Sequence, residues 1–181
     1  FDTLLRSHLE FDSLPWTNAA VSGWVLDPDR KKMSKSKGNV VTPMGLLEEH
    51  GSDAVRYWAA KGGPGVDTAF DPGQMKVGRR LAIKLLNASK FVLAKTDEAS
   101  DVSHVLDRGM LRKLADVVAS STRHREAYDY AAALRETEDF FWWFCDDYIE
   151  LVKRRRAGTD PGAASASRAS VSALSVLLRL F

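Results

Sequence analysis

A seam of apolar side chains at helical spacing constrains the fold of this chain more than any other feature. Between residues 130 and 151 its members step by 4, 3, 4, 3, 4 and 3 positions; they are Tyr130, Leu134, Thr137, Phe141, Phe144, Tyr148 and Leu151. Residues three and four apart share one face of an α-helix, and a face this long and aromatic must be buried against other helices. The seam therefore predicts a long helix in a bundle core. Packing in that core is the favoured role of the aromatic residues at 140–144, and stacking on bases is the less favoured one.

Two further helices are predicted before this seam. Asp71 followed by Pro72 and Gln74 is typical of a capped helix start, and it predicts a helix that runs to about residue 94. The apolar residues that repeat along it are Leu81, Leu85, Ala88 and Val92. Another helix is predicted over residues 106–125, with an inward face of Met110, Leu114, Val117 and Val118. These patterns predict an antiparallel helical bundle over residues 71–181, and a mainly α chain.

The carboxyl-terminal part is also predicted to be helical. Residues 158–167 are rich in Gly, Pro, Ser and Ala and are interpreted as a linker or a helix start, before a fourth helix over residues 170–181. The apolar side chains at its end are predicted to be exposed; they are Leu177, Leu178, Leu180 and Phe181. The Lys-Arg-Arg-Arg run of residues 153–156 closes the seam helix, where cations favour the helix dipole and could also meet an RNA backbone.

Residues 1–70 mix strand and helix patterns, so a short α/β segment is expected there. Residues 19–26 are small, β-branched or aromatic and precede Asp27-Pro28-Asp29, which predicts a β-hairpin on which Trp24 and Val25 pack.

Two short helices are predicted after this hairpin. Thr42 and Pro43 predict the start of a helix that stops at Gly51. Ser52 is predicted to cap the next helix, with an inward stripe of Val55, Trp58 and Ala59. Residues 63–70 then provide the best boundary between two domains, residues 1–70 and 71–181.

Between the hairpin and these helices lies the run KKMSKSKGNVVTP, residues 31–43. Lysines, small hydroxyl side chains and the unhindered backbone at Gly38 can approach phosphate oxygens closely. By composition alone, such a stretch is typical of a solvated surface turn. The ordered string of residues 32–36, Lys-Met-Ser-Lys-Ser, together with its flanks, resembles the mobile phosphate loop of class I aminoacyl-tRNA synthetases.

The flanking sequence narrows this resemblance. The stretches PWTNAAVSGWVLDPDR, PGVDTAFDPGQMKVGRRLAIKLLNASKFVL and FFWWFCDDY are similar to the valyl-tRNA synthetases of high-GC Gram-positive bacteria. Isoleucyl and leucyl enzymes share the lysine loop and the Gly51-Ser52-Asp53-Ala54 helix start but resemble the other stretches less. An isoleucyl or leucyl enzyme, and a non-catalytic tRNA-binding module that kept the loop, are the alternatives.

The resemblance implies a function that this chain shares with a longer protein. It implies the end of a class I Rossmann catalytic region followed by an anticodon-binding domain, in a cytoplasmic and monomeric enzyme that joins valine, ATP with Mg²⁺ and tRNA(Val). It implies catalytic roles for Lys32 and Lys35 at the transferring phosphates, and ATP contacts from Lys32, Met33, Ser34, Lys35 and Ser36. The chain lacks a His-Ile-Gly-His element and an editing domain. We therefore expect it to be an incomplete piece that is inactive by itself.

A polar stripe runs beside the apolar stripe of the helix that begins at residue 71. It consists of Lys76, Arg80, Lys84 and Asn87, with Arg79 and Lys90 close to it. Such a stripe is usually only the solvent-facing side of an amphipathic helix. The family resemblance makes the cations of the stripe candidates for binding tRNA phosphates. It makes the Asn87 amide a candidate for hydrogen bonding to an unstacked base.

Composition excludes several other classes of protein. With 26 Lys and Arg against 24 Asp and Glu, the net charge is +2, so no overall field favours nucleic acid. The single cysteine, Cys145, excludes an internal disulfide, and no Cys/His cluster has zinc spacing, so no bound metal is predicted. No apolar run approaches the length that spans a bilayer, and the chain opens on no signal-peptide pattern.

Overall fold

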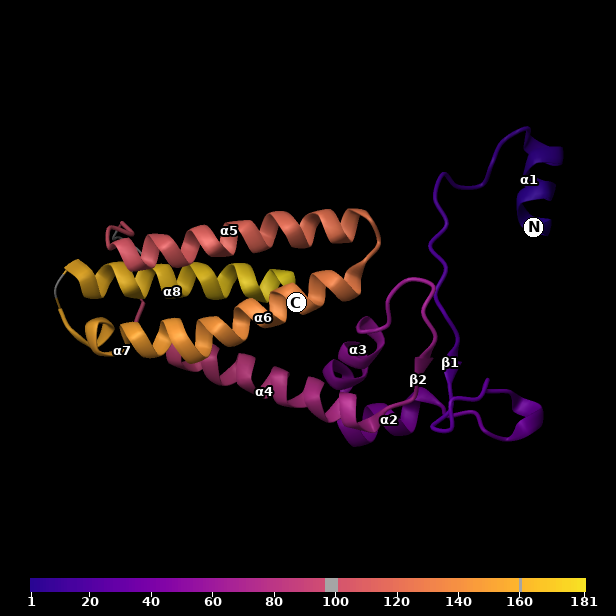
Figure 1. Cartoon of the computed structure of the whole chain (residues 1–181), viewed down its shortest axis with the longest axis horizontal. Helices are drawn as coiled ribbons and strands as arrows, with labels where there is room; N and C mark the ends of the chain where they lie inside the picture. The colour runs from indigo at the N-terminus through magenta and orange to yellow at the C-terminus, as the bar shows by residue number, and fades with distance from the viewer. Residues whose placement is uncertain (97–100, 160) are drawn as a thin grey trace.

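The computed structural model describes residues 1–96, 101–159 and 161–181. Long helices lie side by side at one end, and the strands and α1 lie at the other (Figure 1). The elements are α1 (Asp2–Phe11), β1 (Val25–Leu26), the 3₁₀ turn η1 (Lys35–Lys37), α2 (Pro43–His50), α3 (Ser52–Ala60), β2 (Thr68–Ala69), α4 (Pro72–Leu93), α5 (Val105–Glu126), α6 (Tyr130–Trp143), the π-helical turn η2 (Phe144–Tyr148), α7 (Ile149–Ala157) and α8 (Pro161–Leu180). None of the helices within these described ranges is long and apolar enough to cross a membrane.

The predicted hairpin is replaced by a small parallel sheet. β1 pairs with β2, with Val25 opposite Thr68, and the hairpin survives only as one antiparallel bridge between Leu26 and Lys32. The pairing is possible because Gly23 has no side chain: a Cβ there would lie 2.1 Å from the carbonyl oxygen of Val66. A pattern read locally along residues 19–33 could not reveal a partner more than forty residues away.

Gly51 separates the two short helices. Its φ of 84° ends α2 and makes it the residue before α3, so the prediction that Ser52 caps α3 is wrong. Thr42 does occupy the N-cap position of α2, but its side chain makes no capping hydrogen bond.

The inward face of α3 also differs from the prediction. Ala54 and Tyr57 are buried, whereas Val55 and Trp58 are half-buried and Ala59 is exposed. The face turns because α3 packs on α4 at Gly78, where a Cβ would lie 2.6 Å from Cβ of Tyr57. The Tyr57 hydroxyl then reaches α6 and donates to Glu138 at 2.8 Å.

Helix α4 follows its predicted pattern. The Asp71 carboxylate accepts hydrogen bonds from the backbone N–H groups of Gly73 and Gln74, which confirms the capped start. Of the predicted stripe, Leu81 and Val92 are buried, and the others, Leu85 and Ala88, are half-buried against the same core. The inward residues predicted for α5 also contribute to this core, either buried or half-buried; they are Met110, Leu114, Val117 and Val118.

The seam helix is continuous but changes its register. Its middle, from Thr137 to Tyr148, is buried as predicted, whereas Leu151 is 67% exposed and Val152 is 0% exposed. The π-helical turn η2 comes before Leu151, and its i→i+5 hydrogen bonds enclose one more residue than an α-helical turn, so the inward position moves on by one residue. Tyr130, at the start of the seam, is 42% exposed.

Helix α8 corrects two predictions. It begins at Pro161, so the Gly/Ala/Ser-rich stretch is a helix start from that residue on. Gly158 ends α7, Thr159 follows it outside any helix, and Asp160 lies outside the described residues. Its small side chains are buried where α8 packs on α7 and α5; they include Ala163, Ser165, Ala166, Ala169, Ser170 and Ala173. Leu177 and Leu180 are buried and Phe181 is half-buried, so only Leu178 of the predicted exposed group is exposed.

A buried carboxylate ties these helices together. Asp107 on α5 is fully buried; Oδ1 lies 2.5 Å from Nη2 of Arg155 on α7 and accepts from the Tyr148 hydroxyl at 2.8 Å. Its Oδ2 accepts from the Ser165 hydroxyl on α8 at 2.7 Å. Burial alone would raise the pKa of Asp107, but the hydrogen bonds from these partners outweigh it and hold the pKa below its ordinary value.

We expect Asp107→Asn to lower the unfolding free energy at pH 7 by about 3 kcal/mol, because the negative charge that offsets a largely buried guanidinium is removed. Since the folded pKa is depressed, the carboxylate stabilises the fold fully above its unfolded pKa of about 4, and this stabilisation is lost as the pH falls through the folded pKa. Denaturant unfolding between pH 3 and pH 7 measures both effects.

Asp116→Asn is the matched control, since Asp116 is exposed on the same helix. It should leave the midpoint nearly unchanged at pH 7. Equal midpoints for Asp107→Asn and Asp116→Asn would contradict a stabilising role for the buried carboxylate.

Candidate functional site: the lysine loop and the stripe on α4

The lysine loop is closed at its base by two side chains. Asp27, which is buried, accepts at Oδ1 from the Lys31 N–H (2.7 Å) and at Oδ2 from Nδ2 of Asn39 (2.8 Å). Asn39 in turn accepts the Ser34 N–H at Oδ1 (2.9 Å) and donates to the Lys32 carbonyl oxygen (3.3 Å). The Lys31 N–H and then the Asn39 amide lower the pKa of Asp27. This clamp holds both ends of the loop while leaving its tip outside.

The tip presents donors to solvent. Residues Lys35–Lys37 form the η1 turn, which ends at Gly38 in the left-handed region with a φ of 65°. The Ser34 and Ser36 hydroxyl oxygens lie 3.2 Å apart. Met33 and Ser34 are half-buried, whereas Lys32, Lys35 and Ser36 are exposed.

The surroundings of the loop differ from the prediction at Trp24 and Val25. The expectation that both side chains pack is wrong, since they are 59% and 47% exposed. The sheet forms through the backbone of these residues, which leaves the indole face free for Lys32 Nζ, 3.8 Å from a ring centroid. The sequence predicted a turn at Asp27, and an Asp at the start of a turn is a signal for such backbone contacts.

The α4 stripe is a solvent-facing surface, but one of its residues, Lys84, and the adjacent Arg79 already contact other parts of the protein. Lys76, Arg80, Asn87 and Lys90 are exposed. Arg79 Nη1 donates to the Glu49 carbonyl oxygen on α2 at 3.3 Å. Lys84 Nζ lies 3.0 Å from Oδ1 of Asp146 and 5.5 Å from the Trp142 ring centroid. The stripe residues therefore share a helix, but Lys84 is partly neutralised.

A small cavity opens beside the stripe. It has a volume of about 190 Å³, and its lining includes Lys84, Asn87, Phe91, Cys145 and Ile149. Burial raises the pKa of Cys145 to about 11, so this thiol is uncharged at neutral pH. An amide, an ammonium group and an aromatic ring at one opening match the contacts by which proteins hold single bases.

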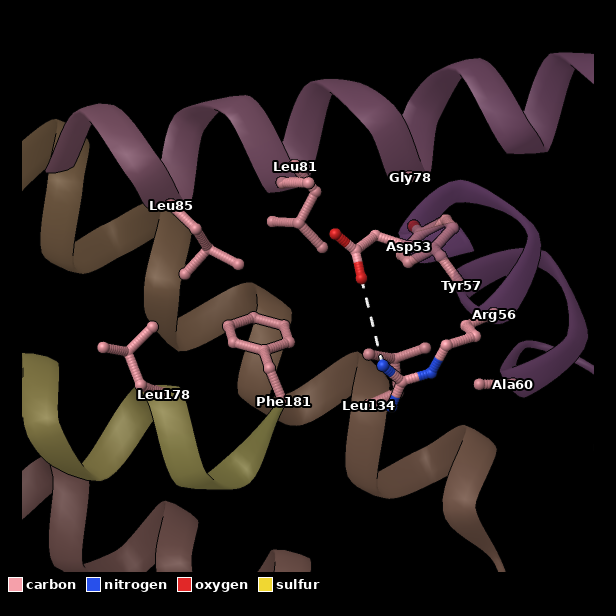
Figure 2. Close-up of a pocket in the computed structure, with 11 residues that line it drawn as sticks. Asp53, Arg56, Tyr57, Ala60, Gly78, Leu81, Leu85, Leu134, Leu178 and Phe181 are labelled. Atoms are coloured by element: carbon pink, nitrogen blue, oxygen red, sulfur yellow. Dashed lines mark ion pairs between the residues drawn. The ribbon is translucent and has the colours of Figure 1, made fainter. Parts of the chain in front are cut away.

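A second cavity lies between the short and the long helices. Figure 2 shows it between α3, α4, α6 and the end of α8, with Leu81, Leu85, Leu178 and Phe181 around it and the Asp53–Arg56 ion pair (3.9 Å) beside it. Its volume is about 510 Å³, and neither the lysine loop nor the polar stripe contributes to its lining. Among the residues that the structure describes, no group of three His, Cys, Asp or Glu is placed to hold a metal ion.

The basic run at the end of α7 is mainly structural. Arg155 binds Asp107, and Arg156 is buried and donates to the carbonyl oxygens of Phe91 (3.1 Å), Val92 and Lys95 (2.6 Å). Arg156 thus satisfies carbonyl groups at the end of α4, where a cation also favours the helix dipole. Only Lys153 and Arg154 of the run are exposed.

Comparison with known proteins agrees with this layout. The family model for class I tRNA synthetases (I, L, M and V) matches residues 2–71, and that for the anticodon-binding domain of tRNA ligases matches residues 107–181. Valine–tRNA ligase from Salinispora arenicola is 64% identical over the whole chain, and that from Thermobifida fusca is 60% identical. The chain spans 22% and 21% of the length of these relatives.

A solved structure shares the fold. It is a LeuRS from Agrobacterium radiobacter, described as the ternary complex LeuRS-tRNA-LeuAMS, which matches 99% of this chain and 22% of its own with a TM-score of 0.74. At 20% identity, this likeness concerns the fold alone.

The clamp at the base of the loop can be tested in this chain. Asn39→Ala should speed amide exchange at Ser34 about fivefold, because a hydrogen bond of about 1 kcal/mol is removed. The pKa of Asp27 should rise toward its ordinary value as the amide donor disappears. Hydrogen exchange and carboxylate titration, both followed by NMR, measure these changes. Asn18→Ala is the control, because it removes an amide that donates to the neighbouring Thr17 hydroxyl and is remote from the clamp. Identical exchange at Ser34 in both variants would refute the clamp.

Proposed function

Because the chain belongs to the class I tRNA synthetases, in the valine–tRNA ligase family, we propose that it supplies the phosphate loop and the anticodon-arm surface of valine attachment to tRNA. In this reaction the valine carboxylate attacks the α-phosphate of ATP, bound with Mg²⁺, and pyrophosphate leaves. A hydroxyl of the terminal adenosine of tRNA(Val) then attacks the valyl carbonyl of the adenylate, and AMP leaves. The high identity to valine–tRNA ligases favours valine over isoleucine or leucine.

One observation carries the first half of the proposal: two exposed ammonium groups lie on a loop whose base is clamped and whose tip is open. Negative charge builds on the β- and γ-phosphates as pyrophosphate leaves. Lys32 and Lys35 can meet that charge in the transition state, where stabilisation increases the rate. The hydroxyls of Ser34 and Ser36 and the backbone near Met33 add donors for the ATP phosphates.

The second half concerns the helices. We assign residues 1–70 to the end of a Rossmann catalytic region and residues 71–181 to an antiparallel helical bundle that binds the anticodon arm. The exposed cations of the α4 stripe would hold phosphates, and Asn87 beside the small cavity would read a base. We place this reaction in the cytoplasm, in a monomeric enzyme. The 181 residues alone should not catalyse ATP–pyrophosphate exchange, because substrate positioning supplies much of the rate.

The role of Lys35 can be measured in a chimaera. In it, residues 1–181 replace the matching segment of the Salinispora arenicola valine–tRNA ligase. Lys35→Ala should slow adenylate formation about 10²- to 10³-fold, since a charge-assisted contact to the transition state is worth about 3 to 4 kcal/mol. Pre-steady-state kinetics should show a much smaller change in ATP affinity.

Lys37→Ala is the matched control, because Lys37 is exposed on the same turn but lies outside the Lys-Met-Ser-Lys-Ser string. A Lys35→Ala rate within a few-fold of the parent chimaera would remove Lys35 from the mechanism.

The α4 stripe makes a separate prediction for tRNA binding. Replacing Lys76, Arg80 and Lys84 by Gln should weaken binding to tRNA(Val) and flatten its salt dependence by about 0.7 to 0.9 for each phosphate that is no longer neutralised. Lys84 should contribute least, because Asp146 already offsets its charge.

Asn87→Ala should instead reduce discrimination between anticodons, since amides read base edges. Titrations of this chain at several salt concentrations, against tRNAs that differ only in the anticodon, separate the two effects.

A triple Gln variant of Arg108, Arg112 and Arg123 on α5 is the control, because it removes three exposed cations from another helix. Equal reductions of affinity in the two triple variants would mean that overall charge, rather than the stripe, governs binding.

A further inference from the structure

The two lysines of the loop have different surroundings. Lys32 Nζ lies over the Trp24 ring, 3.8 Å from its centroid, and the Lys32 carbonyl oxygen is held by Asn39. Lys35 is exposed and has no side-chain partner within the described part of the chain. Side chain and backbone therefore both have partners at Lys32, while the ammonium group of Lys35 is held by none of the described residues.

Trp24 is itself fixed by its backbone. Its N–H donates to Oδ1 of Asp67 at 2.7 Å, and its carbonyl oxygen accepts the Thr68 N–H at 2.9 Å. Its neighbour Gly23 lies directly against Val66. Yet the side chain is 59% exposed, so a large aromatic face is presented to solvent from a rigid support. A tryptophan used for packing would be expected in the core; this one meets an ammonium group instead.

We propose that Trp24 is a positioning residue that preorganises Lys32 for the phosphates of ATP. This inference rests on the proposed function of the lysine loop. Contact with the indole face restricts a side chain that otherwise samples many rotamers, and that entropy is then already lost before the nucleotide binds. The ammonium group still has donors directed away from the ring, because an ammonium carries three N–H bonds. Lys32 is thus the prepositioned cation and Lys35 the mobile one.

The contact can be tested directly in the 181-residue chain. NMR signals of the Lys32 Cε methylene should be shifted upfield by the ring current of Trp24. Trp24→Leu should move them to ordinary lysine values, and Trp24→Phe should keep part of the shift. Ordinary values in the unsubstituted chain would overturn the inference without any reference to catalysis.

The functional consequence can be tested in the same chimaera with the Salinispora arenicola enzyme. Trp24→Leu should slow adenylate formation about two- to fivefold, the range expected for an exposed cation–π contact, and Trp24→Phe should restore most of the rate. In a Lys32→Ala background, Trp24→Leu should have no further effect, because Trp24 acts through Lys32. Trp16→Leu, which removes another exposed indole from the amino-terminal segment, should leave the rate unchanged.

The outcomes separate the inference from the proposed function. Suppose that Lys32→Ala slows the reaction but Trp24→Leu does not, or that Trp24→Leu slows the unsubstituted chimaera and the Lys32→Ala chimaera equally. Either result overturns the inference and leaves the role of the loop intact. A faster reaction in Trp24→Leu also overturns the inference, since the ring would then hold Lys32 away from the phosphates. If Lys32→Ala has no effect, the proposed role of Lys32 fails, and the role of Trp24 fails with it.

Discussion

The contact of Tyr57 with Gly78 and Glu138 is the constraint on which the arrangement of this protein depends. Only a residue without a side chain at position 78 lets α3 lie directly on α4, and the Tyr57 hydroxyl then reaches α6 at 2.8 Å. Burial and the nearby Glu138 raise the pKa of Tyr57, so the phenol remains a donor at neutral pH. Since α3 follows the lysine loop and α6 belongs to the long helices, this contact fixes the two candidate surfaces relative to each other (Figure 1).

Patterns with a local physical cause could be predicted from the sequence. The Asp71 cap, the inward stripe of α4 and the middle of the seam depend on residues within a few turns of one another, and all three are observed. The parallel pairing of β1 with β2 could not be predicted, because it depends on close approach at Gly23 by a distant segment. The prediction that Leu151 is buried was wrong because the 4, 3 spacing assumes a regular α-helix, and the π-helical turn η2 interrupts that regularity.

The same distinction applies to the candidate site. The Lys-Met-Ser-Lys-Ser string identifies the loop, since it requires only neighbouring residues. Its supports, Asp27, Asn39 and Trp24, act through contacts that only folding reveals. The basic run at the end of α7 is a second example of contacts that only folding reveals. Arg155 and Arg156 look like part of a basic patch in the sequence, yet one binds a buried carboxylate and the other the carbonyl groups of α4.

Exposed charges therefore have to be judged by what they already contact. Lys84 and Asp146 form an exposed ion pair at 3.0 Å, and such pairs contribute only about 0.2 to 1 kcal/mol. A phosphate group can displace Asp146 at little cost, so the pair does not exclude Lys84 from an RNA surface. It does keep the ammonium group near the Trp142 ring and the small cavity that Asn87 also lines. A weak ion pair at this position keeps the cation oriented while leaving it available for exchange, which a buried pair such as Arg155–Asp107 would not allow.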